Sequence, residues 1–218
     1  MILLFAAAAS AAVPLQLAGY PGDWITPDDY PPLALSKGEW GYYSFALTVA
    51  PTGKNEKCEI ISPGGFDDLR DLTCALVMKR AKFRPALDVD GHPVFGVFRS
   101  SVAWTQGSNM ADIQRLRKRF PPPSDSDLDV SVNQLPAGME KSAKVKLGVQ
   151  VDEKGAIKAC NRDPSEKASA LDAVACQQIE AQWKVAAATD KGGAPVSSVQ
   201  SVTVAFSTGA QPQASAAQ

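Results

Sequence analysis

The sequence predicts an α+β fold in which one small β-β-α-β module is used twice. The first observation is an internal repeat at an offset of 102 residues, which relates Cys58 to Cys160 and Cys74 to Cys176. The second is strict alternation of apolar and polar residues early in each copy, which indicates a strand with one buried face. A fixed period of this kind means that one supersecondary unit is duplicated. We therefore expect two modules, each a three-stranded antiparallel sheet covered by a helix.

The repeat extends beyond the cysteines and needs no gap between residues 45 and 104. It preserves glycine and proline turn markers together with apolar positions. The matching pairs are Gly53 and Gly155, Leu69 and Leu171, Lys82 and Lys184, Ala86 and Ala188, Gly91 and Gly193, Pro93 and Pro195, Val94 and Val196, and Val102 and Val204. Chance similarity would not keep so many markers in register.

Residues 1–12 are predicted to be a signal peptide. The stretch is apolar except for Ser10, and it has the length of a signal-peptide core rather than of a membrane span. Ala9-Ser10-Ala11 supplies a small-x-small pattern for cleavage near Ala11 or Ala12. We therefore expect an exported, periplasmic protein. The alternatives are a buried N-terminal helix, or membrane association through an anchor that begins upstream of Met1.

The first module is predicted over residues 25–104. A strand, a turn with glycine and a second strand lead into a helix, and a third strand begins after Gly91-His92-Pro93. The helix presents one apolar stripe. The positions that we expect to be buried are Tyr43, Phe45, Leu47 and Val49 in the first strand, Cys58 and Ile60 in the second, Leu69, Leu72 and Val77 in the helix, and Val94, Phe98, Val102 and Trp104 in the third.

The second module is predicted over residues 127–207 with the same order of elements. Its helix is expected to open at Asp163-Pro164-Ser165-Glu166, which offers an N-cap, a proline in the first turn and an acid three residues on. The expected buried positions are Val145, Leu147, Val149, Val151, Cys160, Leu171, Val174, Ile179, Val196, Val202, Val204 and Phe206.

Residues 105–126 are predicted to be a linker, and residues 208–218 a disordered tail rich in small and polar residues. Within the linker, a short basic helix is expected over Asp112 to Phe120, followed by a stiff Pro121-Pro122-Pro123 run. The basic helix is either a solvated face or a contact for anionic lipid.

The four cysteines are predicted to form one disulfide in each module, Cys58–Cys74 and Cys160–Cys176. Each pair is separated by 16 positions, and a helix that covers the sheet can reach a cysteine on the second strand. Four cysteines allow three pairings, and the repeated spacing favours pairing within each half. Free thiols would be expected only in a cytosolic protein.

Composition and motifs argue against an enzyme, a metalloprotein or a nucleic-acid-binding protein. A net charge of −1 provides no electrostatic footprint for nucleic acid. His92 is the single histidine and lies in a predicted turn, where an exposed spacer is the simpler role. Cys-x-x-Cys pairs and the common hydrolase and phosphate-binding motifs are missing from the sequence. We expect no catalytic residue, metal, cofactor or small-molecule substrate.

Three blocks of the first module together indicate a known family. Tyr30-Pro31-Pro32-Leu33-Ala34, followed by Gly38 and Gly41, precedes the first strand; Lys82-Phe83-Arg84-Pro85-Ala86 follows the helix; and Asp90-Gly91-His92-Pro93-Val94 precedes the last strand. In this order they resemble the TonB C-terminal domain family. The second module is more divergent, since it keeps Trp183-Lys184-Val185, Gly193, Pro195 and Val196 but opens only with Leu135-Pro136.

The resemblance implies a periplasmic protein-interaction domain. Such domains are thought to capture an extended segment of an envelope protein, such as an outer-membrane receptor, by strand addition. The family's energy transducers also carry a transmembrane anchor and a long proline-rich spacer, which this sequence does not show. An envelope scaffold without a peptide ligand, and an energy transducer with a longer N-terminal anchor, are the alternatives.

The candidate binding edge is the third strand of the first module, near residues 94–102. Gly96 lacks a side chain, so another backbone can approach closely there, and Val97 lies on the face opposite Phe98. The alternative is that Gly96 marks a bulge and that Val97 packs against the second module. The matching strand of the second module, with Ser197, Ser198 and Gln200, is more polar. The candidate site residues are Val94, Gly96, Val97, Phe98, Tyr30 and Pro31.

Overall fold

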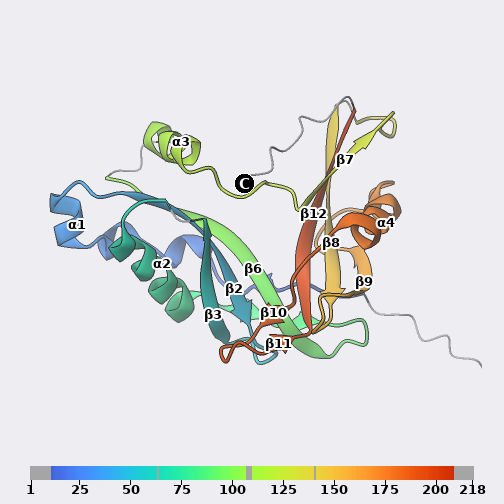
Figure 1. The fold of residues 1–218 in the computed structure, drawn as a ribbon, viewed down its shortest axis with the longest axis horizontal. Coiled ribbons are helices and arrows are strands. Elements are labelled where there is room, and N and C mark those ends of the chain that lie inside the picture. The colour runs from blue at the N-terminus through green and yellow to red at the C-terminus, as the bar shows by residue number, and fades with distance from the viewer. Residues whose placement is uncertain (1–10, 63, 107–109, 140, 209–218) are drawn as a thin grey trace, which may run out of the picture.

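The computed structural model describes residues 11–62, 64–106, 110–139 and 141–208 of the chain. The predicted leader and tail therefore lie largely outside the described residues. Within the described part, no helix is long and apolar enough to cross a membrane. The predicted α+β class is confirmed, since helices and strands alternate along the chain and pack together (Figure 1).

Module 1, residues 25–104, is built on β2 (Gly41–Val49), β3 (Asn55–Ser62), α2 (Asp67–Arg80) and β6 (Pro93–Trp104). The long strand β2 pairs antiparallel with β3 on one side and with β6 on the other. Short elements precede and interrupt this plan: β1 (Gln16–Leu17), two 3-10 helices (Pro21–Asp23 and Pro27–Asp29), α1 (Pro32–Ser36), β4 (Phe83–Arg84) and β5 (Ala86–Leu87).

Module 2, residues 127–207, is built on β8 (Ser142–Val151), β9 (Ile157–Arg162), α4 (Asp172–Gln182) and β12 (Ser198–Thr208). Strand β8 pairs antiparallel with both β9 and β12. Before it come α3 (Met110–Arg119) and β7 (Leu128–Val132), and β10 (Ala188–Thr189) and β11 (Pro195–Val196) form a small hairpin before β12. Residue 208, predicted to open the tail, is the last residue of β12.

The sequence predicts a separate three-stranded sheet in each module. In the structure, the two modules instead share one continuous sheet. Its strand order is β3-β2-β6-β12-β8-β9, with β6 and β12 at the centre. These two strands pair in parallel over Phe95 to Val97 and Ser198 to Gln200. A three-stranded sheet leaves unpaired backbone groups at both edges, and joining the two last strands satisfies part of them.

Each module has its own apolar core, and most of the predicted buried positions contribute to it. In module 1, residues of β2 and α2 form the core, and β2 is buried on both faces. In module 2, residues of β8, β12 and α4 do so. One prediction is wrong: Val174 is exposed, and Ala175 takes the buried position on α4.

The helix of module 2 also begins later than predicted. Residues 163–166 form a turn, in which the Asp163 carboxylate accepts hydrogen bonds from the backbone and hydroxyl of Ser165. Helix α4 starts at Asp172, whose carboxylate accepts a hydrogen bond from the Ser169 N–H at 2.9 Å. The N-cap residue is therefore Leu171, which makes no side-chain cap hydrogen bond, and the acid in the first turn of α4 is Asp172.

Both predicted disulfides are present in the structure. Cys58 on β3 is bonded to Cys74 on α2, with 5.6 Å between their Cα atoms. Cys160 on β9 is bonded to Cys176 on α4, with 5.5 Å between their Cα atoms. Each bridge ties the helix of a module to the outer strand of the same module.

Candidate functional site

The two edges of β6 have different partners. One edge pairs with β2 along Gly96 to Trp104. The other pairs with β12 only at residues 95–97, after which the two strands diverge. In Figure 1 they meet in the lower part of the view and spread apart upwards, while the segment between α3 and β7 crosses above them. The candidate site lies in this fork.

The direction of the backbone groups on β6 follows from those on β2. The Tyr42 N–H donates to Gly64 O at 2.6 Å, and the Ala50 N–H donates to Lys54 O at 2.8 Å, both on the β3 side. Successive residues of a strand direct their backbone groups to opposite edges. The odd-numbered residues of β2, such as Phe45, therefore face β6.

It follows that the even-numbered residues of β6 pair with β2, because Ser100 lies opposite Phe45 in the register. The N–H and C=O groups of Arg99, Ser101 and Ala103 then face the fork. These three residues lie opposite β2 in the register, but none of the described strands pairs with them on the side of the fork. They form the open edge of β6, defined here as residues 99–103.

A cleft of about 820 Å³ lies in the fork between β6 and β12. The open edge contributes Arg99 and Ser101, and Ser201 and Thr203 of β12 face them. Residues 122–126 of the linker and Asp127, the first residue of module 2, line the same cleft. The linker is attached at both ends: Phe120 packs on Trp40 of module 1, and the Asp127 N–H donates to Thr203 O at 2.8 Å in module 2.

The side chains that line the cleft are more basic than acidic. The cations are Arg99, Arg117, Lys146 and Lys184, and the anions are Asp125 and Asp127. Arg99 donates from Nη2 to the buried Gln200 Oε1 at 2.8 Å, where β6 and β12 separate. Lys146 forms an ion pair with Glu166 at 3.2 Å. An extended segment that carries acidic side chains would be favoured here.

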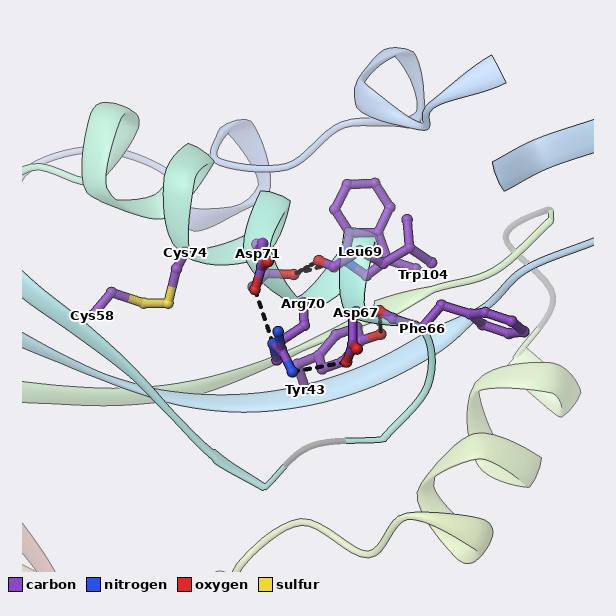
Figure 2. A network of polar contacts seen from close by, with 10 residues as sticks. Tyr43, Cys58, Phe66, Asp67, Leu69, Arg70, Asp71, Cys74 and Trp104 are labelled. Carbon is purple, nitrogen blue, oxygen red and sulfur yellow. Dashed lines mark hydrogen bonds and ion pairs between the residues drawn. A yellow bond between two sulfur atoms is a disulfide. The ribbon is translucent and has the colours of Figure 1, made fainter. Parts of the chain in front are cut away.

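A buried polar network holds the far end of β6. Figure 2 shows Trp104 directed at α2, where its Nε1–H donates to Thr73 Oγ1 at 2.8 Å. The Thr73 hydroxyl in turn donates to Leu69 O at 2.7 Å. Trp104, Thr73 and Leu69 are all buried. The network fixes the end of β6, and with it the open edge, against the helix.

The structure divides the predicted site residues between the two ends of β6. Tyr30 packs edge-on against Trp104, with 5.5 Å between ring centroids, and its hydroxyl donates to Glu39 O. Burial raises the pKa of Tyr30, and the Glu39 carboxylate adds to this. Pro31 caps α1. Tyr30 and Pro31 therefore support the core near Trp104, far along the strand from Val94.

The other predicted residues lie where the modules meet. Val94 packs in the small core between them, and Phe98 packs against Trp24 inside module 1. Val97 is opposite Gln200 in the register, so the alternative in which it packs against module 2 is the one that the strand pairing supports. A Cβ at Gly96 would lie 2.4 Å from Leu15 Cγ, so a side chain of the N-terminal segment occupies the space beside this glycine.

Strand β7 and the open edge are two features of the site that we did not predict from the sequence. Strand β7 pairs in parallel with β12, Leu128 opposite Val204 and Val132 opposite Thr208. The alternation of Leu128, Val130 and Val132 in the sequence is the signal that would predict a strand there. The open edge carries no such signal, because it depends on where β12 leaves β6.

The 102-residue repeat relates this pairing to module 1. Residues 204–208 of β12 correspond to residues 102–106, of which 102–104 are the end of β6 and 102–103 belong to the open edge. In module 2, therefore, the outer edge of the last strand is filled by an added parallel strand from the linker. In module 1, no described strand fills the equivalent edge beyond Val97.

One group of side chains in the described residues has the spacing of a metal site: Asp88, Asp90 and His92. It lies in an exposed turn, where Asp88 Oδ1 accepts the backbone N–H groups of Asp90 and His92, each at 2.9 Å. Burial acts to raise the pKa of Asp88, but these donors outweigh it and the pKa lies below its usual value. Asp190 closes the matching turn of module 2 in the same way. The cluster is therefore explained by turn formation.

Comparison with known proteins identifies one region of the chain. Residues 26–104 match a family model described as Gram-negative bacterial TonB protein C-terminal. The family is a periplasmic protein-interaction domain and not an enzyme family. The match covers module 1 and does not extend to module 2. No curated protein and no solved structure gives a significant match.

Proposed function

Because residues 26–104 match the TonB C-terminal domain family, we propose that the protein captures an extended segment of an envelope protein by strand addition at the open edge of β6. The partner pairs with the backbone of Arg99, Ser101 and Ala103 and lies in the cleft of about 820 Å³. The sequence suggests the edge near residues 94–102, and we propose its second part because Phe95 to Val97 already pair with β12.

The observation that carries the proposal is the pairing of β7 with β12. The repeat gives the last strands of both modules the same environment, and in module 2 that environment accepts an added strand along Val204 to Thr208. In module 1 the corresponding positions overlap the open edge at residues 102 and 103, and none of the described strands is added there. An extended peptide gains main-chain hydrogen bonds at an edge of this kind.

The outer edge of β3 is less suited to strand addition. Strand β3 carries Glu56, Lys57 and Glu59, and charged side chains of this kind discourage pairing. Its Cys58 is also tied to α2. The open edge carries a single charge, Arg99, and spans roughly 13 Å at about 3.3 Å per residue. A peptide of about five residues is long enough to pair with it.

The partner that we propose is a segment of an envelope protein, such as an outer-membrane receptor, that combines alternating apolar residues with acidic ones. The basic lining of the cleft supports the acidic residues, and strand β7 is itself such a segment, with Asp129 between Leu128 and Val130. Export to the periplasm is part of the proposal. It is supported by the family and by the two disulfides, which form in oxidising compartments.

A labelled peptide with the sequence of residues 127–133 is the probe that tests this function. Its binding to the purified protein is measured by fluorescence anisotropy, with a scrambled peptide for comparison. The key variant is Ser101→Pro, which removes one backbone donor from the open edge. We expect affinity to fall about fivefold to tenfold, because a main-chain hydrogen bond contributes about 1 kcal/mol and the ring obstructs pairing.

The matched control is Ser101→Thr, which retains the N–H and should bind as the wild type does. Circular dichroism confirms that both variants are folded. Unchanged affinity in folded Ser101→Pro would refute binding at this edge. The same variants, used as bait in envelope extracts, then separate peptide capture from a scaffold role: a scaffold would retain its partners in both variants.

A further inference from the structure

The first described residues form a segment that contacts both modules. Ala12 is fully buried, whereas Ala11 beside it is exposed. Ala12 belongs to a small core with Ala86 of module 1 and Val199 of module 2. We define the N-terminal segment as residues 12–17.

On the side of module 2, Asn161 holds the segment at its first residue. The Ala12 N–H donates to Asn161 Oδ1 at 2.8 Å, and Asn161 Nδ2 donates to Ala12 O at 3.0 Å. A Cβ at Gly148 would lie 2.4 Å from Ala12 O, so the glycine permits this approach. One amide side chain therefore satisfies both backbone groups of Ala12, much as a neighbouring strand would.

On the side of module 1, the segment is held by main-chain pairing. Val13 and Leu87 exchange two backbone hydrogen bonds, at 2.8 and 2.9 Å. Residues 16–17 then pair with residues 83–84 as strands β1 and β4. Leu15 packs against Gly96, directly beside the three residue pairs that join β6 to β12.

We infer that the N-terminal segment is a clasp that locks module 2 onto module 1, and that proteolytic processing at the Ala11–Ala12 bond creates its free end. Hydrolysis of this bond by a leader peptidase consumes one water and leaves a carboxylate on Ala11 and an amino group on Ala12. The protonated amino group then donates to Asn161 Oδ1, and charge-assisted hydrogen bonds are stronger than neutral ones. Cleavage one residue later would remove Ala12 and both bonds to Asn161.

The position of the cleavage agrees with two independent features. The small-x-small pattern Ala9-Ser10-Ala11 ends at the bond in question. Ala11 is exposed and Ala12 is buried, so the buried N-terminal segment begins immediately after that pattern. The inference shares export with the proposed function and does not depend on peptide capture.

The processing is tested by expressing the complete chain in a Gram-negative host, with sequencing and intact mass of the protein recovered from the envelope. We expect the mature chain to begin at Ala12. A chain that begins at Val13 or later, or that retains Met1, would overturn the assignment of the cleavage site.

The clasp is tested on the mature protein by amide hydrogen exchange in the Asn161→Ala variant, with Gln178→Ala, an amide on α4, as the control. We expect exchange at residues 95–97 and 198–200 to accelerate on the order of thirtyfold, the factor that follows from losing two hydrogen bonds of about 1 kcal/mol each. Exchange within β8 should not change. Wild-type exchange at the seam, or a uniform loss of protection through β8, would overturn the clasp.

A second variant tests the clasp by changing the residue that lies against the backbone of Ala12. Gly148→Ala places a methyl group against Ala12 O and should produce the same selective acceleration at the seam. Gly192→Ala is its control, because the added Cβ meets only the Asp190 side chain, at 3.3 Å. If Gly148→Ala leaves the seam as protected as Gly192→Ala does, the segment does not hold the modules together. The test of peptide binding with the Ser101→Pro variant does not depend on these exchange measurements. Either proposal can therefore be refuted without the other.

Discussion

Replacing Thr73 by valine should destabilise module 1, although the change in side-chain shape is small. The hydroxyl of Thr73 accepts the indole N–H of Trp104 at 2.8 Å (Figure 2). Both residues are buried, so water cannot replace the lost partner. An unsatisfied buried donor costs about 1–3 kcal/mol. For a chain of this length, each kcal/mol lowers Tm by about 2–4 °C, so the expected loss is about 2–12 °C.

Module 2 supplies the control for this prediction. At the positions that correspond to Thr73 and Trp104 it carries Ala175 and Phe206, which are both buried and form no such hydrogen bond. The double variant Thr73→Ala, Trp104→Phe recreates this apolar pair inside module 1. We expect it to be less destabilised than the sum of its single variants, with a coupling of about 1 kcal/mol.

Urea denaturation followed by tryptophan fluorescence and circular dichroism gives the free energy of unfolding of each variant. A Thr73→Val variant as stable as the wild type would show that the indole N–H needs no buried partner. Strict additivity in the double variant would show that the two side chains act separately. Either result would refute the reasoning.

Three further predictions concern stability. Replacing Cys58 and Cys74 by alanine should reduce the free energy of unfolding in urea by about 3 kcal/mol, because the bridge closes a loop with a sequence separation of 16; a loss below about 1 kcal/mol would contradict this. The Arg80 guanidinium holds the pKa of Asp29 well below its usual range, so this stabilisation is present above about pH 3.9 and is lost as the pH falls towards the folded-state pKa. Asp29→Asn should therefore lower Tm at pH 7, with a difference that shrinks in acid; a constant difference would argue against the ion pair. Gly155→Ala should cost more than about 1 kcal/mol, because φ is +80° and the new Cβ would lie 2.6 Å from a carbonyl oxygen; an unchanged Tm would disprove it.

The features that the sequence predicts well are local ones. Alternation in β2 and β8 places Phe45 and Leu147 in the cores, because the period of a strand fixes which face is buried. The equal spacing of the cysteines predicts both disulfides, since the helix of each module packs against the second strand of the same module. The three sequence blocks predict the family whose model matches residues 26–104.

The features that it misses are contacts between distant segments. The pairing of Phe95 with Ser198 depends on how two complete modules meet, and no local pattern in β6 announces it. The same holds for Asn161, a polar residue on β9 whose partner is the backbone of Ala12. The sequence therefore predicts an edge near residues 94–102, and it cannot predict that residues 95–97 of this edge already pair with β12.

The seam between the modules has a consequence for the order in which the protein folds. Asn161 follows Ala12 by 149 residues, and β12 is the last strand of the chain. Contacts of such large sequence separation form slowly. In a chain that crosses a membrane with its N-terminus first, module 1 is complete while β12 is still to emerge. During that interval residues 95–97 have no strand on the side that later pairs with β12, so this edge of β6 is exposed to chaperones or to a neighbouring chain. Closure of the seam is the step that ends this exposure.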